Sequence, residues 1–116
     1  MAQKTREEHR AADAQQLEVR RSHGDALHIP REVEHFSYFR SNGKAKAAAS
    51  ELESAGFRVE LTKSLFSTLV VARIDRDVLP ETVEATVSAV YDIVTAAGGN
   101  YDGWGGSVAV EVAPTD

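Results

Sequence analysis

The chain has 116 residues, no cysteine, and 18 acidic against 13 basic side chains, which gives a formal net charge of −5. This length fits one domain with a single packed core. The lack of cysteine excludes disulfides, zinc-thiolate sites, iron–sulfur clusters and a cysteine nucleophile. The negative charge disfavours non-specific binding to phosphate backbones and to anionic lipid.

The N-terminal segment is charged and has no apolar stretch of the kind that a secretory signal needs. No apolar run approaches the roughly 20 residues that span a bilayer. We therefore expect a cytoplasmic protein that does not bind membranes. The acidic excess lies after residue 32, because the charges of the first 32 residues balance. It would suit a basic partner, but it also serves as an ordinary solubility device.

Residues 5–22 have the composition of a surface helix. Thr5 and Glu8 fit a capping box, in which hydroxyl and carboxylate oxygens accept hydrogen bonds from free backbone N–H groups. The apolar side of this helix is thin and is expected to consist of Ala11, Ala14, Leu17 and Val19. With so little apolar surface to bury, the helix should be marginal unless it docks on another element. We treat residues 1–23 as a helical extension and residues 24–116 as one domain.

The middle of the chain alternates strand and helix patterns. Residues 33–40 are rich in β-formers and predict a first strand. Residues 44–55 predict an alanine-rich helix that ends at Gly56, where a positive φ is expected. Residues 57–62 alternate apolar and polar side chains, which is typical of a half-buried strand. After a hairpin turn, residues 65–74 predict a third, more apolar strand.

A second helix follows, with Asp77 or a neighbour as its cap and Pro80 in its first turn. Four valines at helical spacing mark its buried face: Val83, Val87, Val90 and Val94. The glycine pair at 98–99 ends this helix. After a loop, residues 108–112 alternate valine with other side chains and predict the last strand, and Pro114 closes the ordered chain.

The predicted order is a helix followed by β-α-β-β-α-β. Two crossover helices around one hairpin predict an α+β fold, the ferredoxin-like βαββαβ sandwich, with an antiparallel sheet in the strand order 4-1-3-2. The second and fourth strands alternate cleanly, as edge strands with one wet face should. The central strands are apolar on both sides, so we expect the N-terminal helix, a second copy or a partner to cover part of the outer sheet face.

Residues 100–106, Asn-Tyr-Asp-Gly-Trp-Gly-Gly, are the most specific local pattern. Asp102-Gly103 is strong turn chemistry, so we expect a loop here. Trp104 is the only tryptophan of the chain. It is either a lid on the core, with Tyr101 pinning the loop, or an exposed interface anchor, since Trp and Tyr are frequent energetic hot spots. A phosphate cradle is a weaker alternative, because the glycines precede a strand and no basic residue accompanies them.

The histidines give only weak evidence of a metal site. His23, Asp25 and His28 lie close in sequence but lack a third firm ligand, so we expect neither metal nor cofactor. His35, on the first strand, is either a satisfied core residue or a polar contact in a binding surface. The chain has no nucleophile elbow, Walker loop or dinucleotide fingerprint, and we expect no enzymatic activity.

The aromatic residues Phe36, Tyr38 and Phe39 of the first strand raise the question of RNA recognition. A sheet that stacks bases needs aromatic side chains on both central strands, in basic surroundings. Residues 67–74 have no aromatic side chain and the folded body is acidic. Direct binding of nucleic acid is therefore not expected.

Three parts of the chain resemble one protein family. They are Gly24-Asp25 with Pro30-Arg31-Glu32-Val33-Glu34-His35 and Tyr38-Phe39, then Ala55-Gly56-Phe57-Arg58-Val59, and finally Asn100-Tyr101-Asp102-Gly103-Trp104-Gly105. These parts are similar to the regulator of ribonuclease activity B family, protein inhibitors of ribonuclease E, and the resemblance covers roughly residues 24–112. It implies a ferredoxin-like fold without catalytic activity, and a role in binding ribonuclease E and altering which transcripts that enzyme cleaves.

The leading hypothesis is a non-enzymatic regulator that binds a protein partner through the 100–106 segment and the nearby sheet. Its expected contact residues are Tyr101, Asp102, Gly103, Trp104, His35 and Tyr38. One alternative is a ferredoxin-like module that binds a small molecule or RNA. Another is a self-associating domain that forms a homodimer through its open sheet face.

Overall fold

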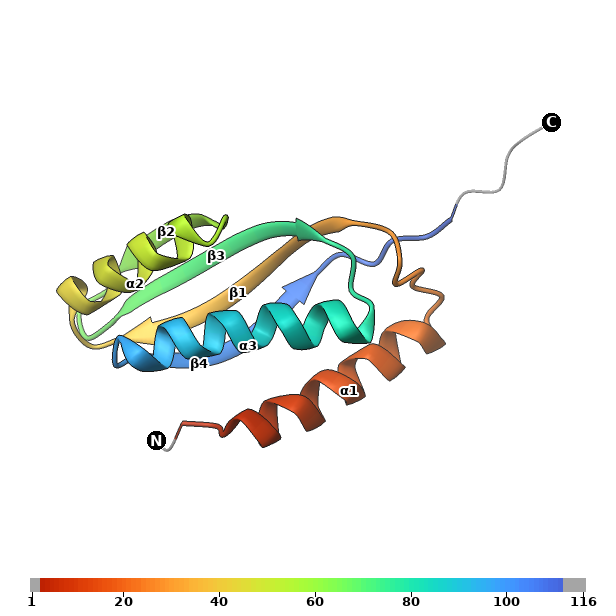
Figure 1. Ribbon diagram of the computed structural model, residues 1–116, viewed down its shortest axis with the longest axis horizontal. Coiled ribbons are helices and arrows are strands. Elements are labelled where there is room, and N and C mark those ends of the chain that lie inside the picture. Colours follow the sequence, from red (N-terminus) through yellow and green to blue (C-terminus); the bar gives the residue numbers. More distant parts are fainter. Residues whose placement is uncertain (1–2, 112–116) are drawn as a thin grey trace.

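The computed structural model describes residues 3–111 and shows an α+β fold with one four-stranded antiparallel sheet (Figure 1). The elements are α1 (Arg6–Ser22), β1 (Arg31–Phe39), α2 (Asn42–Ser54), β2 (Arg58–Lys63), β3 (Thr68–Arg76), α3 (Pro80–Ala96) and β4 (Asn100–Gly106). The first six lie close to the predicted ranges, and Gly56 has the expected positive φ of 100°. No helix within residues 3–111 is long and apolar enough to cross a bilayer.

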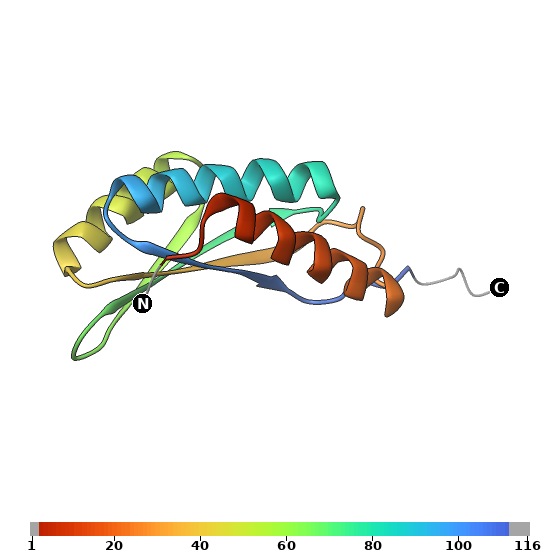
Figure 2. The same ribbon diagram turned by 90° about the horizontal axis from the view of Figure 1, so that it is seen from below.

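The strands lie in the order β2-β3-β1-β4, and each neighbouring pair is antiparallel. Read from the β4 edge, this is the order 4-1-3-2. The two helices α2 and α3 lie on one face of the sheet, and α1 lies against α3 near the β4 edge (Figure 2). The N-terminal helix therefore leaves the outer sheet face open. The sequence predicts this helix, a second copy or a partner as the cover of that face, and the first of these predictions is wrong.

The last strand is formed by Asn100–Gly106, the segment expected to be a loop, so the prediction of a strand over 108–112 is wrong. Val108 and Val110 are exposed and lie outside any strand, and Val112 falls outside the described residues, as does Pro114. In the observed register, Trp104 lies opposite His35 and faces the core. An aromatic side chain buries more apolar surface than a valine, which favours the observed strand.

A change of register at Asp102 lets β4 accommodate its turn-forming residues. The pairing of β4 with β1 shifts between Phe36 and Ser37, and Gly103 takes a φ of 115°. Only glycine adopts this conformation without strain. The Asp-Gly pair therefore makes a bulge within the strand instead of a turn that ends it.

The capping box of α1 is confirmed, because the Thr5 hydroxyl accepts from the Glu8 amide and the Glu8 carboxylate accepts from the Thr5 amide. Its predicted apolar side is largely wrong. The buried residues of α1 are His9, Asp13 and Leu17. Of the four side chains predicted to face inward, only Leu17 does so. The helix packs against aromatic side chains of the core, and polar residues such as His9 can make favourable contacts with these rings.

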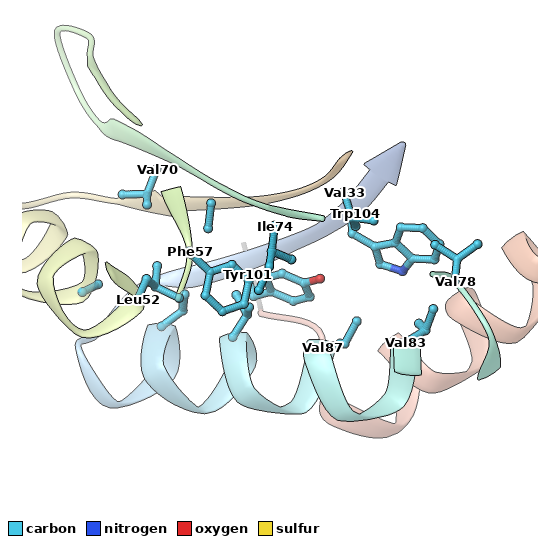
Figure 3. Close-up of a cluster of buried hydrophobic side chains, with 14 of the residues drawn as sticks. Val33, Leu52, Phe57, Val70, Ile74, Val78, Val83, Val87, Tyr101 and Trp104 are labelled. Carbon is cyan, nitrogen blue, oxygen red and sulfur yellow. The ribbon is translucent and has the colours of Figure 1, made fainter. Parts of the chain in front are cut away.

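The core lies between the sheet and the helices α2 and α3 (Figure 3). The four valines of α3 are buried as predicted, and they meet large side chains such as Leu52, Phe57 and Tyr101. Each buried valine contributes roughly 1.5 kcal/mol or more to the hydrophobic stabilisation. Because of this packing, α3 is the central element of the helical layer.

Gly99 is the glycine at which a side chain is least tolerated. A Cβ atom there would come within 2.3 Å of the buried Phe39 ring. We expect Gly99→Ala to lower the free energy of unfolding by about 1–3 kcal/mol in urea denaturation, as overpacked cores do. Gly43→Ala is the matched control, since its Cβ would meet only the Ser41 hydroxyl at 3.6 Å. Equal stability of the two variants would contradict the described packing.

Candidate interaction site

The six residues expected to contact a partner divide between the inside and the outside of the molecule. Trp104 is only 7% exposed, and Tyr101 and His35 are fully buried. Tyr38 and Asp102 are exposed, and Gly103 is partly exposed. Of the two interpretations of Trp104, the structure therefore agrees with the lid on the core.

Trp104 is held in place by α1. Its indole Nε1–H donates a hydrogen bond to Asp13 Oδ1 at 3.0 Å, and the Arg20 guanidinium lies 5.0 Å from the centre of its ring. Gln16 donates to the Trp104 carbonyl at 3.5 Å. Burial raises the pKa of the Asp13 carboxyl, against the opposing effect of the Trp104 hydrogen bond. Two side chains of α1 thus contact the indole, and a third binds the backbone of the same residue.

Tyr101 connects the sheet to the helices through a second buried contact. Its hydroxyl lies 2.8 Å from His35 Nδ1, and its ring lies 4.9 Å from the His9 ring of α1. Burial raises the pKa of the Tyr101 hydroxyl and lowers the pKa of His35 to about 4. Both groups are therefore neutral near pH 7, where they serve as a hydrogen-bonded pair inside the core.

The space beside these groups is too small for a substrate. A cavity lined by His35 and Trp104 has a volume of about 10 Å³, which is the room that one water molecule needs. The acids and imidazoles that converge here pack against aromatic rings instead of lining a cleft. The geometry supports a structural role for His9, Asp13 and His35.

The Asp25 carboxylate forms ion pairs with two arginines. Arg31 Nη1 lies 2.6 and 2.7 Å from its two carboxylate oxygens, and Arg20 Nη1 lies 3.1 Å from one of them. Burial alone would raise the pKa of Asp25, but these hydrogen bonds outweigh burial and hold the pKa below its usual value. They join the end of α1 to the start of β1. Within residues 3–111, no group of three metal-ligating side chains comes together.

The open sheet face has an apolar part and a charged part. The apolar part comprises Phe36 and Tyr38 of β1 with Leu69 and Val71 of β3, paired directly across the two strands. Tyr38 is exposed, Phe36 and Leu69 are partly buried, and Val71 is buried. In the charged part, Arg73 lies 2.8 Å from Glu34, and Arg58 lies 3.1 Å from both Glu32 and Asp75. The exposed pairs of Arg58 are screened by water and contribute little stability. The apolar part is the better candidate for a contact surface.

The tip of the β2–β3 hairpin extends this apolar surface. Leu65 and Phe66 are 86% and 84% exposed. The turn that carries them is ordered by hydrogen bonds, since the Ser64 amide and hydroxyl both donate to the Ser67 carbonyl, at 2.8 and 3.0 Å. In Figure 2 this green hairpin projects away from the helices, on the open side of the sheet. Two bulky apolar side chains held in water in this way are typical of an interaction site.

Residues 10–106 match the family model described as "Regulator of ribonuclease activity B". The chain belongs to the regulator of ribonuclease activity B family. A search of curated proteins finds no match. The matched range ends at the last residue of β4 and includes most of α1, so the family pattern covers both elements that enclose Trp104.

In this member of the family, Tyr101 and Trp104 of the glycine-rich segment lie inside the fold. The sequence predicts a hairpin turn before residue 65, but the turn extends further, and Leu65 and Phe66 lie at its exposed tip instead of in the third strand. Ser67, which follows them, was the signal that could have indicated the longer turn. The buried partners His9 and Asp13 gave no such signal, since polar residues on a helix normally face water.

The link between Asp13 and Trp104 can be measured with a double-mutant cycle. We expect Asp13→Ala to lower the free energy of unfolding by about 1–3 kcal/mol, because the buried indole N–H loses its acceptor. In a Trp104→Phe background, which has no such N–H, the same substitution should cost at least 1 kcal/mol less, to order of magnitude. Glu18→Ala, on the exposed side of α1, is the control. Additive effects would argue against the contact.

His35 should make stability depend on pH between about 7 and 5. Its folded pKa of about 4 lies below the usual 6.5, so the unfolded chain binds more protons in this window and stability falls as pH falls. We expect a loss of roughly 2 kcal/mol at pH 5 from this residue. Burial also lowers the pKa of His9, which acts in the same direction. In urea titrations His35→Gln should show a flatter pH profile, and a profile parallel to wild type would exclude this explanation.

Proposed function

We propose that this protein is a non-enzymatic regulator that binds a protein partner, ribonuclease E, in the cytoplasm and so modulates RNA decay. The observation that carries the proposal is the match of residues 10–106 to the regulator of ribonuclease activity B family. The closed packing around His35 and Trp104 supports a role without catalysis, because a substrate has no room beside these groups.

The open sheet face and the hairpin tip are the proposed contact surface. Phe66 is an exposed aromatic side chain of the kind that is enriched in interfaces, and Leu65 beside it adds exposed apolar surface. Of the six residues expected from the sequence, we propose direct contact for Tyr38, Asp102 and Gly103. For the buried Tyr101, Trp104 and His35 we propose an indirect role, in which they hold β4 and β1 in the shape that the partner meets.

The layout supports a finer description of the fold. We infer that the domain predicted at 24–116 is a ferredoxin-like sandwich over its described residues 24–111, and that the described part of the helical extension, residues 3–23, is docked on it. The crossovers β1-α2-β2 and β3-α3-β4, each of which skips one strand of the sheet, support this description. A homodimer that pairs through the open sheet face is the second candidate, because the same exposed apolar side chains would favour it.

The proposal predicts that purified chain captures ribonuclease E in a binding assay. Phe66→Ser should weaken this binding at least 10-fold, to order of magnitude, which corresponds to about 1.4 kcal/mol. Val19→Ser is the matched control, since Val19 is an exposed apolar residue on α1, away from the sheet face. No capture by the wild-type chain would refute ribonuclease E as the partner. Capture that Phe66→Ser leaves unchanged would move the contact to another face.

A further inference from the structure

The hairpin tip and the end of the sheet enclose a groove. It runs between the tip of the β2–β3 hairpin, the end of β1, the start of α2 and the start of β4. Its main lining residues are Tyr38, Arg40, Lys44, Phe66, Asn100 and Asp102. The space is about 660 Å³, within the roughly 300–1,000 Å³ typical of binding clefts. Unlike the cavity beside His35, it can therefore hold several side chains of a partner.

Two exposed aromatic side chains stand on the walls of the groove, in addition to the buried Phe39. Phe66 is 84% exposed and Tyr38 is 42% exposed. Phe66 sits on the turn that Ser64 and Ser67 hold in place, so it is presented by a defined backbone. A bulky apolar side chain placed between these two rings would remove both from water, which is favourable by roughly 25 cal/mol for each Å² of apolar surface buried.

The charge of the groove is opposite to that of the whole chain. Arg40 and Lys44 both line it. Within residues 3–111, neither side chain takes part in an ion pair. The first turn of α2, which carries Lys44, has no acidic residue. Asp102 is the one acidic residue among the lining side chains within the described range. Two free cations therefore stand beside two exposed aromatic rings, in a chain of net charge −5.

We propose that this groove binds an acidic segment of a partner protein that carries a bulky apolar side chain next to its carboxylates. The carboxylates would pair with Arg40 and Lys44, and the apolar side chain would lie between Tyr38 and Phe66. Arginine pairs with carboxylates through charge-assisted hydrogen bonds that also fix orientation. The inference deepens the proposed function and rests on it, because it states the chemistry that the bound partner presents.

The charges around the groove favour a protein over RNA. On the described part of the sheet face that continues from it, four acidic residues pair with only two arginines, Arg58 and Arg73, so this face keeps an acidic excess. The four acids are Glu32, Glu34, Glu60 and Asp75, and Asp102 stands in the groove itself. A single strand of RNA would bring phosphates toward these acids, whereas RNA-binding sheets have basic surroundings. The hairpin tip of a second copy would be a less suitable occupant, because Lys63 beside that tip has the same charge as Arg40 and Lys44.

Two synthetic peptides test this proposal on the full chain. Both contain the same leucine and phenylalanine residues, but one has glutamate and the other lysine at the remaining positions. In amide NMR spectra, the glutamate peptide should shift the signals of Tyr38, Lys44 and Phe66, and the lysine peptide should not. An Arg40→Glu/Lys44→Glu variant should weaken binding of the glutamate peptide at least fivefold, while Lys46→Glu, exposed on the same helix outside the groove, should bind like wild type.

Four results would overturn the inference. They are no shift in the groove, equal binding of the two peptides, a single-stranded RNA oligonucleotide that binds the groove more tightly, and a dimer whose interface buries the groove. The ribonuclease E assay separates this test from the proposed function. If the glutamate peptide binds as expected but ribonuclease E does not, the proposed function fails and the groove chemistry stands. If ribonuclease E binds wild type and the charge-reversed variant equally, the groove chemistry fails and the function stands.

Discussion

The buried hydrogen bond between Trp104 and Asp13 is the contact on which the arrangement of the whole molecule depends. An indole can be buried only if its N–H finds an acceptor, because an unsatisfied donor in the core costs about 1–3 kcal/mol. The Asp13 carboxylate on α1 is that acceptor, at 3.0 Å. Since this contact directs α1 to the helical side of the molecule, against α3 and β4, the opposite face of the sheet is left without a cover of its own.

The same contact explains why a helix with so little apolar surface is docked at all. Only Leu17 is apolar among the buried residues of α1. The remaining interactions are polar or aromatic: His9 packs on the Tyr101 ring, Asp13 accepts from Trp104, and the Arg20 guanidinium lies over the indole. Polar contacts of this kind demand exact geometry, so they specify one docked position where a purely apolar stripe could slide.

The sequence predicted the parts of the fold that depend on local rules. The capping box at Thr5, the positive φ at Gly56 and the valine face of α3 each follow from residues a few positions apart. The last strand could not be predicted in this way. Both the valine alternation at 108–112 and the aromatic residues of 100–106 could supply the strand that pairs with the free edge of β1. Which segment pairs there depends on how well its side chains are buried against residues far away in the sequence. For the candidate site, Tyr38 was found from its position on a central strand, whereas Phe66 was concealed within an apolar run that looked like a strand.

Tyr101 and Trp104 of the glycine-rich segment lie inside the fold, whereas the proposed contact surface is the open sheet face with the groove beside the hairpin tip. Because the chain has a single tryptophan, its fluorescence reports on this division directly. The native protein should emit at short wavelength and resist quenching by acrylamide, and unfolding in urea should shift the emission to longer wavelength and remove the protection. Native emission that already matches the unfolded chain, with free access for the quencher, would show that Trp104 faces water and would contradict the account.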